Sequence, residues 1–177
     1  MLKWGWENKL CPLNALTYAI AAAGGHIEIV KWMRQLVPWD ARACCDAALN
    51  GYLELLKWAR GNGCEWDERT CENAAWGGHL EVLKWARENG CPWLSSACSA
   101  AAENGHLQVL QWLRAHGCPW DSEICRLAAK SQQAETLKWA RENGCPWFLD
   151  SVSREYLEDD GLRNLAWVKK IGVTWDE

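Results

Sequence analysis

The residues of this 177-residue chain whose types could support metal, redox or nucleophilic chemistry are its ten cysteines and four histidines. A metal site of the structural zinc type is usually built on a C-x-x-C pair, whereas Cys64 and Cys71 are seven residues apart. The spacing therefore does not favour a metal site. Eight of the cysteines form two columns, meaning sets of residues that recur every 27 positions: Cys64, Cys91, Cys118 and Cys145; and Cys44, Cys71, Cys98 and Cys125.

A disulfide between equivalent cysteines of one column is excluded by geometry. Equivalent residues of packed helices lie about 8–10 Å apart, beyond the ~7 Å that a disulfide allows between Cα atoms. Val37 and Val173 fall in the first column, and Tyr18 and Val152 fall in the second, so these positions accept apolar residues. We therefore interpret the columns as small buried side chains. Cys45, which stands outside both columns, is the cysteine that we expect to be accessible.

Three of the histidines also recur in a column, in which His26, His79 and His106 alternate with Tyr52 and Gln133. A position that accepts tyrosine and glutamine is not a metal-binding or catalytic position. The sequence also contains no Gly-rich phosphate loop, no H-E-x-x-H and no nucleophile elbow. We therefore predict a protein with no enzymatic activity, no cofactor and no bound metal.

Most of the fifteen tryptophans follow the same period as the cysteines. The eleven residues LKWARENGCPW at 83–93 return at 137–147, which is two periods later. Similarity at a fixed period is the sequence signature of a repeat architecture, in which each unit is one supersecondary element. We interpret the tryptophans as packing between repeats rather than as an aromatic cage. Their two main columns are Trp58, Trp85, Trp112 and Trp139; and Trp39, Trp66, Trp93, Trp120 and Trp147.

Each unit is predicted to contain two helices. In residues 64–90, Asp67 is a good N-cap for a first helix of about ten residues, and Gly78 suits the positive φ of a tight turn. A second helix over 79–89 then ends at Gly90, and we call the loop that leads from it to the next first helix the link. Equivalent residues occur in other units: Asn14, Asp40 and Asp121 as caps; Gly25, Gly51 and Gly105 in the turn; Gly63, Gly117 and Gly144 at the end.

The second helix is apolar over more than half of its circumference. At about 100° per residue, its polar side chains Glu81, Lys84 and Glu88 fall on one narrow stripe. Such a helix must be covered on more than one side, which a stack of helix pairs provides. Alanine pairs such as Ala74 and Ala75 allow the first helices of neighbouring units to approach closely. The sequence therefore predicts an all-α solenoid of stacked helix-turn-helix repeats.

The segments AAWGGHLEVLKWARENGC, AAENGHLQVLQWLRAHGC and AAAGGHIEIVKWMRQLV carry a family resemblance. They are similar to the AA-x-x-G-H-L-E-V-V-K-L-L-L-x-x-G-A core of ankyrin repeats. Two features differ: RTCE at 69–72 stands where the family has Thr-Pro-Leu-His, and the period is 27 rather than about 33. The resemblance implies ankyrin-like repeats that lack the β-hairpin fingers. It is nearest to the short, Trp- and Cys-rich variety seen in giant viruses, algae and protists.

The repeats extend over the whole sequence, so we predict a single ankyrin-like repeat domain over 1–177. Residues 1–10 are interpreted as the remnant of a preceding helix. In the last segment Tyr156 and Leu157 replace the alanine pair, as expected of a capping repeat. The repeats are expected at 11–36, 37–63, 64–90, 91–117 and 118–144, with a degenerate capping repeat at 145–177.

Binding residues are expected where the units differ, which is on the solvent side of the first helix. The exposed stripe of the second helix, by contrast, repeats Glu-x-x-Lys with little change. Ankyrin-like stacks bind partners on the first-helix side, so the resemblance implies a protein-binding face there, with Trp76 as its anchor. The predicted partner-binding residues are Arg42, Asp46, Leu49, Arg69, Glu72, Asn73, Trp76, Ser99, Glu103, Glu123, Arg126 and Lys130.

Charge and composition bear on the class of partner. A formal net charge of −4, with scattered basic residues, disfavours nucleic acid, and no segment is long and apolar enough to span a membrane or to act as a signal peptide. We predict a monomeric, cytoplasmic protein, or one of the host cytoplasm if the source is viral, that acts as a scaffold or adaptor for an unidentified protein partner. The alternatives are a thiol- or metal-responsive protein that uses the cysteine columns, and a structural spacer without a binding role.

Overall fold

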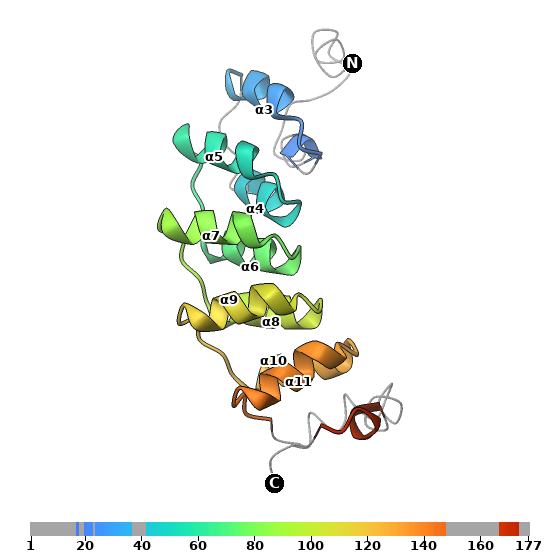
Figure 1. Cartoon of the computed structure of the whole chain (residues 1–177). Coiled ribbons are helices and arrows are strands. Elements are labelled where there is room, and N and C mark those ends of the chain that lie inside the picture. Colours follow the sequence, from blue (N-terminus) through green and yellow to red (C-terminus); the bar gives the residue numbers. More distant parts are fainter. Residues whose placement is uncertain (1–16, 18–19, 23, 37–41, 148–166, 174–177) are drawn as a thin grey trace. The chain divides into compact units, whose positions relative to one another are not determined.

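Consecutive helices form pairs joined by tight turns (Figure 1). The computed structural model describes residues 17, 20–22, 24–36, 42–147 and 167–173. Within these ranges every regular element is a helix, which confirms the predicted all-α class, and the links carry no strand. The helices are α3 (Ile27–Arg34), α4 (Arg42–Leu49), α5 (Leu53–Gly61), α6 (Glu68–Trp76), α7 (Leu80–Glu88), α8 (Ser95–Glu103), α9 (Leu107–Ala115), α10 (Ser122–Lys130) and α11 (Ala134–Glu142).

Side-chain caps begin two of the first helices, as predicted. The carboxylate of Asp67 accepts a hydrogen bond from the backbone N–H of Arg69 at 3.1 Å, at the start of α6. Asp121 accepts from the N–H of Glu123 at 3.0 Å, at the start of α10. Each carboxylate satisfies an amide that has no partner inside its helix. The other two predicted caps, Asn14 and Asp40, lie outside the described residues.

Glycines with positive φ form the turns within and after each helix pair. Gly78 has a φ of +75° between α6 and α7, and Gly90 has a φ of +84° after α7. Side chains other than hydrogen are strained in this region of backbone space, which explains the choice of glycine. In the turn between α10 and α11 the positive φ is taken by Gln132, at +55°. The predicted glycines Gly25, Gly51, Gly63, Gly105, Gly117 and Gly144 all have positive φ.

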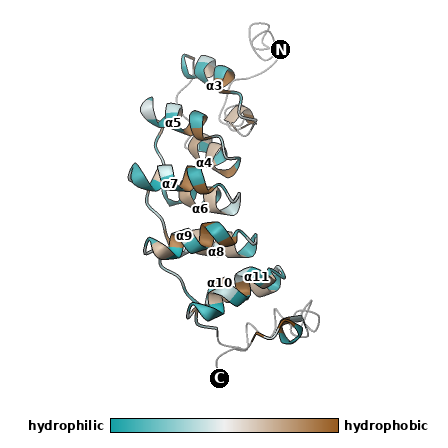
Figure 2. Ribbon diagram, in the orientation of Figure 1, coloured by the Kyte–Doolittle hydropathy of each residue, from teal (hydrophilic) through white to brown (hydrophobic). Residues whose placement is uncertain are grey.

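The chain divides into two compact units, which are described separately. Unit 1 comprises Met1–Ala74 and Glu81–Pro92, and unit 2 comprises Ala75–Leu80 and Trp93–Glu177. In unit 2, α8 packs on α10, and the alanine pairs of both helices are fully buried. Each helix carries both hydrophobic and hydrophilic residues (Figure 2), as expected of amphipathic helices that share a core. The largest fully buried side chains of the second helices are Met33, Leu56 and Leu83 in unit 1, and Leu110, Leu113 and Leu137 in unit 2.

The tryptophan columns form edge-to-face pairs within repeats. Trp66 in the link meets Trp85 of α7, with ring centroids 5.6 Å apart and planes at 67°. The same pair recurs as Trp93 with Trp112 and as Trp120 with Trp139. These rings are half-buried, so one part of each indole stays at the surface. Two arginines make contacts between repeats. The guanidinium group of Arg60 lies over the ring of Trp66 at 4.6 Å, and that of Arg114 lies over the ring of Trp120 at 4.3 Å.

The end of the chain is described only in part. Residues 167–170 form a helical turn, in which Val168 is buried, and Val173 is also buried. Tyr156 and Leu157, on which the capping-repeat interpretation rests, lie outside the described residues, as do residues 1–10. The single-domain organisation and the repeat boundaries stay predictions.

Candidate functional site

The twelve predicted partner-binding residues all lie on first helices and all reach the surface. None of them is buried. The alanine pairs on the opposite side of each first helix face the core, so the predicted residues face solvent. In unit 1 they are Arg42, Asp46, Leu49, Arg69, Glu72 and Asn73, and in unit 2 they are Trp76, Ser99, Glu103, Glu123, Arg126 and Lys130.

In unit 2 the first helices end in three chemically different side chains. Trp76 ends α6, Glu103 ends α8 and Lys130 ends α10. The indole of Trp76 is 45% exposed, and it is the one exposed tryptophan among the described residues. Glu103 is half-buried and Lys130 is exposed. The ends of these helices therefore present an aromatic, an acidic and a basic group on one unit.

A side chain from the following repeat holds the end of two of these first helices, α6 and α8. His106, at the N-cap position of α9, reaches back so that its Nε2 lies 2.9 Å from the backbone carbonyl oxygen of Trp76. Because a carbonyl only accepts, Nε2 is the nitrogen that carries the proton. Gln133, at the start of α11, donates in the same way to the carbonyl of Glu103 at 3.5 Å. The backbone that presents Trp76 is thus fixed by a neighbouring repeat.

Sequence reasoning placed these residues correctly at the turn before the second helix but missed the contact that they make. Their side chains make no cap hydrogen bond to their own helix. The available signal was a long side chain with a polar tip, 28 residues after a glycine of positive φ: His106 after Gly78, and Gln133 after Gly105. A Cβ on Gly78 would stand 2.6 Å from Nδ1 of His106, so this turn must be glycine for the ring to fit.

Two arginines of the predicted set form ion pairs with nearby carboxylates. Nε of Arg126 donates to Oε2 of Glu123 at 2.7 Å, and its NH2 group donates to Oε1. The Arg126 guanidinium therefore lowers the pKa of Glu123 below its ordinary value. Arg69 donates through Nε and NH2 to a single oxygen of Asp67, Oδ2, at 2.9 and 2.7 Å, and the pKa of Asp67 is lowered for the same reason. Both arginines are held in place without losing their positive charge.

Comparison with known proteins agrees with this geometry. Residues 44–87, which span α4 to most of α7, match the family model described as ankyrin repeats in many copies. The fold is that of an ankyrin repeat domain. The crystal structure of the human ASB11 ankyrin repeat domain is similar to this chain with a TM-score of 0.65 and 17% sequence identity, covering 90% of this chain and 85% of that one. No curated protein matches the sequence. Because 141 chains of solved structures match, the fold alone does not single out a partner.

One residue of the first-helix face joins neighbouring ankyrin repeats. The side-chain amide of Asn73 on α6 donates to the backbone carbonyl of Cys45 on α4 at 3.3 Å. The Cys45 thiol lies 3.7 Å from the Thr70 hydroxyl, and Cys45 is only 6% exposed. The expectation that Cys45 is accessible is therefore wrong, because α6 covers it. Desolvation by this burial raises the pKa of the Cys45 thiol.

The outer stripe of the second helices is a solvated surface of local ion pairs. Lys31, Lys57 and Lys84 each bind a glutamate three residues earlier, at 2.8–2.9 Å. Because the arrangement is the same in three ankyrin repeats, it offers little that could distinguish one partner from another. The variation between repeats lies on the first helices, as the sequence predicted.

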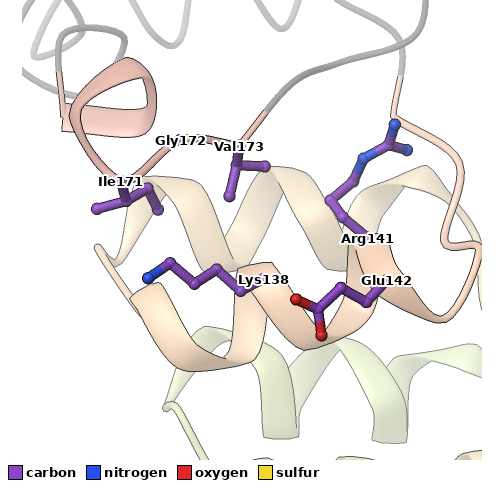
Figure 3. A pocket seen from close by; sticks show the side chains of 6 residues that line it. All are labelled: Lys138, Arg141, Glu142, Ile171, Gly172 and Val173. Carbon is purple, nitrogen blue, oxygen red and sulfur yellow. The ribbon is translucent and has the colours of Figure 1, made fainter.

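A surface hollow of about 500 Å³ lies beside the last ankyrin repeat of unit 2. Ile171 and Val173 stand on one side of it, and charged side chains from α11 stand on the other (Figure 3). One of these, Arg141, donates to the carbonyl of Cys145 at 2.7 Å. The hollow contains none of the predicted partner-binding residues.

In the part of the chain that the structure describes, no group of three or more histidine, cysteine or acidic side chains is placed to hold a metal ion. None of the helices in those ranges has the length and apolar content needed to cross a bilayer.

Proposed function

We propose that this ankyrin repeat protein is a non-enzymatic scaffold or adaptor that binds a protein partner on the first-helix face of unit 2, with Trp76 as the anchor. One observation carries the proposal: Trp76 is 45% exposed, whereas the other described tryptophans are half-buried or buried. A large aromatic side chain held at the surface by a fixed backbone is a common centre of protein-protein interfaces.

The expected contribution of Trp76 follows from its exposed area. A tryptophan buries about 150–250 Å², so the 45% that is exposed here amounts to roughly 70–110 Å². At about 25 cal/mol per Å², covering this area contributes ~2–3 kcal/mol, or roughly 30- to 100-fold in Kd. The hydrogen bond from His106 to the Trp76 carbonyl fixes the backbone before binding, so less ordering is needed when a partner arrives.

The charges on the same unit bear on the kind of partner. Glu103 and Lys130 end the other two first helices, and Arg126, which is paired with Glu123, has 21% of its side chain exposed. Such a mixture of signs around an aromatic anchor suits a protein surface. A nucleic acid would require a concentration of positive charge, which a chain of formal net charge −4 does not supply. The unit 1 residues of the predicted set, a monomeric state and a cytoplasmic or host-cytoplasmic location belong to the same proposal.

The test is a quantitative capture experiment with two matched variants. Wild type, Trp76→Ala and Leu94→Ala are immobilised at equal density and exposed to lysate of the source or host cell. Leu94 is the control because it is an apolar side chain, 55% exposed, that lies outside the first-helix face. Far-ultraviolet circular dichroism first establishes that all three proteins are equally helical.

We expect a protein that is captured by wild type and by Leu94→Ala, and whose capture falls at least tenfold with Trp76→Ala. Equal capture by all three proteins would overturn the role of the first-helix face and would favour the structural spacer. Loss of capture with Leu94→Ala alone would place the binding surface at the links instead.

A further inference from the structure

The cysteines of the two columns lie in pairs that sequence reasoning did not compare. The Sγ of Cys44 on α4 donates a hydrogen bond to the Sγ of Cys64, in the link after α5, at 2.9 Å, and the residues are 20 positions apart. A hydrogen bond between thiols also joins the other members of the two columns at the same separation. These further pairs are Cys71 with Cys91, Cys98 with Cys118, and Cys125 with Cys145.

Each pair joins a first helix to the link that follows its own helix pair. The link thiol also donates to the backbone carbonyl of the residue that precedes the first helix, as Cys91 does to Asp67 at 3.3 Å and Cys145 does to Asp121 at 3.2 Å. An arginine at the end of the second helix donates to the carbonyl of the link cysteine, as Arg87 does to Cys91 at 3.2 Å. The link sulfur is therefore held against the first helix from two sides.

The geometry of the pairs suits a disulfide better than a metal. A disulfide sets the sulfur atoms about 2.05 Å apart, so the Cys44 and Cys64 sulfurs need to approach by only ~0.9 Å. Among the described residues no third cysteine, histidine or acidic side chain joins any pair to complete a metal site. All eight thiols are 0% exposed, which separates each pair from water.

The direction of the hydrogen bonds distinguishes the two sulfurs of a pair. Because the first-helix thiol donates, negative charge is stabilised on the link sulfur, and this lowers the pKa of Cys91 and of Cys145. The partner thiol and burial raise the pKa of Cys44 and of Cys98 on the first helices. In the pairs that contain Cys91 and Cys145, the link cysteine is therefore the thiol that loses its proton more readily, and we assign the nucleophile of each pair to the link cysteine.

We propose that the four pairs are modification sites at which a small-molecule disulfide, such as glutathione disulfide, oxidises this chain to four disulfide bonds, each between a first helix and the link that follows its helix pair. The thiolate of the link cysteine attacks one sulfur of glutathione disulfide, which breaks its S–S bond and releases one glutathione thiolate. The first-helix thiol then loses its proton and attacks the protein sulfur of this mixed disulfide, releasing the second glutathione. The two thiol protons end on the two glutathiones, and the protein has lost two electrons for each bond.

The four bonds follow one another along the chain without overlapping. They close the segments 44–64, 71–91, 98–118 and 125–145, each of which contains the turn and second helix of one helix pair. Each bond therefore constrains one helix pair independently of the others. Because the thiols are fully buried, the folded, reduced protein reacts slowly, and the bonds form when a link opens or while the chain folds.

The test uses the full chain and glutathione. Reduced protein is unfolded in urea, diluted into buffers of graded oxidised-to-reduced glutathione ratio, and quenched with iodoacetamide. Non-reducing peptide mapping by mass spectrometry then identifies the bonds, each of which removes two hydrogen atoms. We expect the four pairs named above, unchanged helicity, and a urea midpoint that rises on oxidation and returns with dithiothreitol. Cys98→Ala should remove one bond and leave three, and the control Cys45→Ala should leave all four.

Three results would overturn the proposal. The first is a helical chain that carries only glutathione adducts or free thiols at these positions. The second is a different pairing of these cysteines, such as Cys64 with Cys71. The third is loss of helicity on oxidation, since the bonds must be compatible with the helix pairs. Peptide mapping of the wild-type chain decides among these results even if Cys98→Ala fails to fold.

Discussion

Substituting alanine for Gly78 tests whether the contact between His106 and the preceding repeat stabilises the fold. Gly78 has a φ of +75°, which costs a residue with a Cβ ~1–2 kcal/mol. The new Cβ would also stand 2.6 Å from Nδ1 and 2.7 Å from Cε1 of His106. The ring must move away, which breaks its 2.9 Å contact with the Trp76 carbonyl and costs a further ~1 kcal/mol. We expect Gly78→Ala to lower the free energy of unfolding by about 2–3 kcal/mol.

Gly90→Ala is the matched control, because Gly90 has a φ of +84° and a Cβ there would meet nothing within 4 Å. It should cost only the backbone term of ~1–2 kcal/mol. Urea unfolding followed by circular dichroism, with identical slopes required for the comparison, gives both values. The excess cost of Gly78→Ala over Gly90→Ala isolates the His106 contact, because both substitutions reduce the conformational entropy of the unfolded chain equally.

The double variant supplies the decisive comparison. If the excess cost arises from the His106 ring, then Gly78→Ala made in a His106→Ala protein should cost no more than Gly90→Ala. Equal costs of the two glycine variants in the wild-type background would refute the reasoning. An excess that survives the removal of His106 would show that another group fills the space beside Gly78.

Two further predictions concern caps and charge. Leu94 occupies the N-cap position of α8 with φ −126° and makes no side-chain cap bond, so Leu94→Asp should raise the free energy of unfolding by ~1 kcal/mol at pH 7, as measured by urea denaturation. The gain should disappear as the new carboxylate is protonated. Glu123→Gln should cost ~0.3–0.5 kcal/mol, because the ion pair with Arg126 is partly exposed. Arg126 lowers the pKa of Glu123 from 4.5, so this stabilisation is full above that pH and is lost as pH falls through the lowered pKa; unfolding curves of both proteins should therefore converge in acid.

The helix pairs could be predicted because the local chemistry that defines them is complete within one repeat. Asp67 caps a helix through its own following amides, and Gly78 and Gly90 adopt the positive φ that their positions require. The amphipathic stripe then indicates which side of each second helix is covered. Exposure of the first-helix residues followed from the same pattern, since the alanine pairs opposite them had to face the core.

Contacts that depend on how helices fold back on each other could not be derived in this way. The sequence argument compared cysteines 27 residues apart, but the thiols that meet are 20 residues apart, one on a first helix and one in the link that follows its helix pair. The constant separation of 20 residues between the two cysteine columns was the sequence signal for these pairs. The tryptophans were expected to pack between repeats, but the ring pairs lie within one repeat, because the link at the start of a repeat lies beside the second helix of that repeat.

His106 binds the backbone carbonyl of Trp76, and a carbonyl is a group that every amino acid possesses. His106 and Gln133 contact backbone carbonyl oxygens, not the side chains of Trp76 and Glu103. The residue at the end of a first helix can therefore change from aromatic to acidic without altering the connection to the next repeat. Duplication or exchange of whole repeats preserves this hydrogen bond between repeats for the same reason. Such a chain can acquire new surface chemistry through ordinary mutation and recombination while its architecture is inherited unchanged.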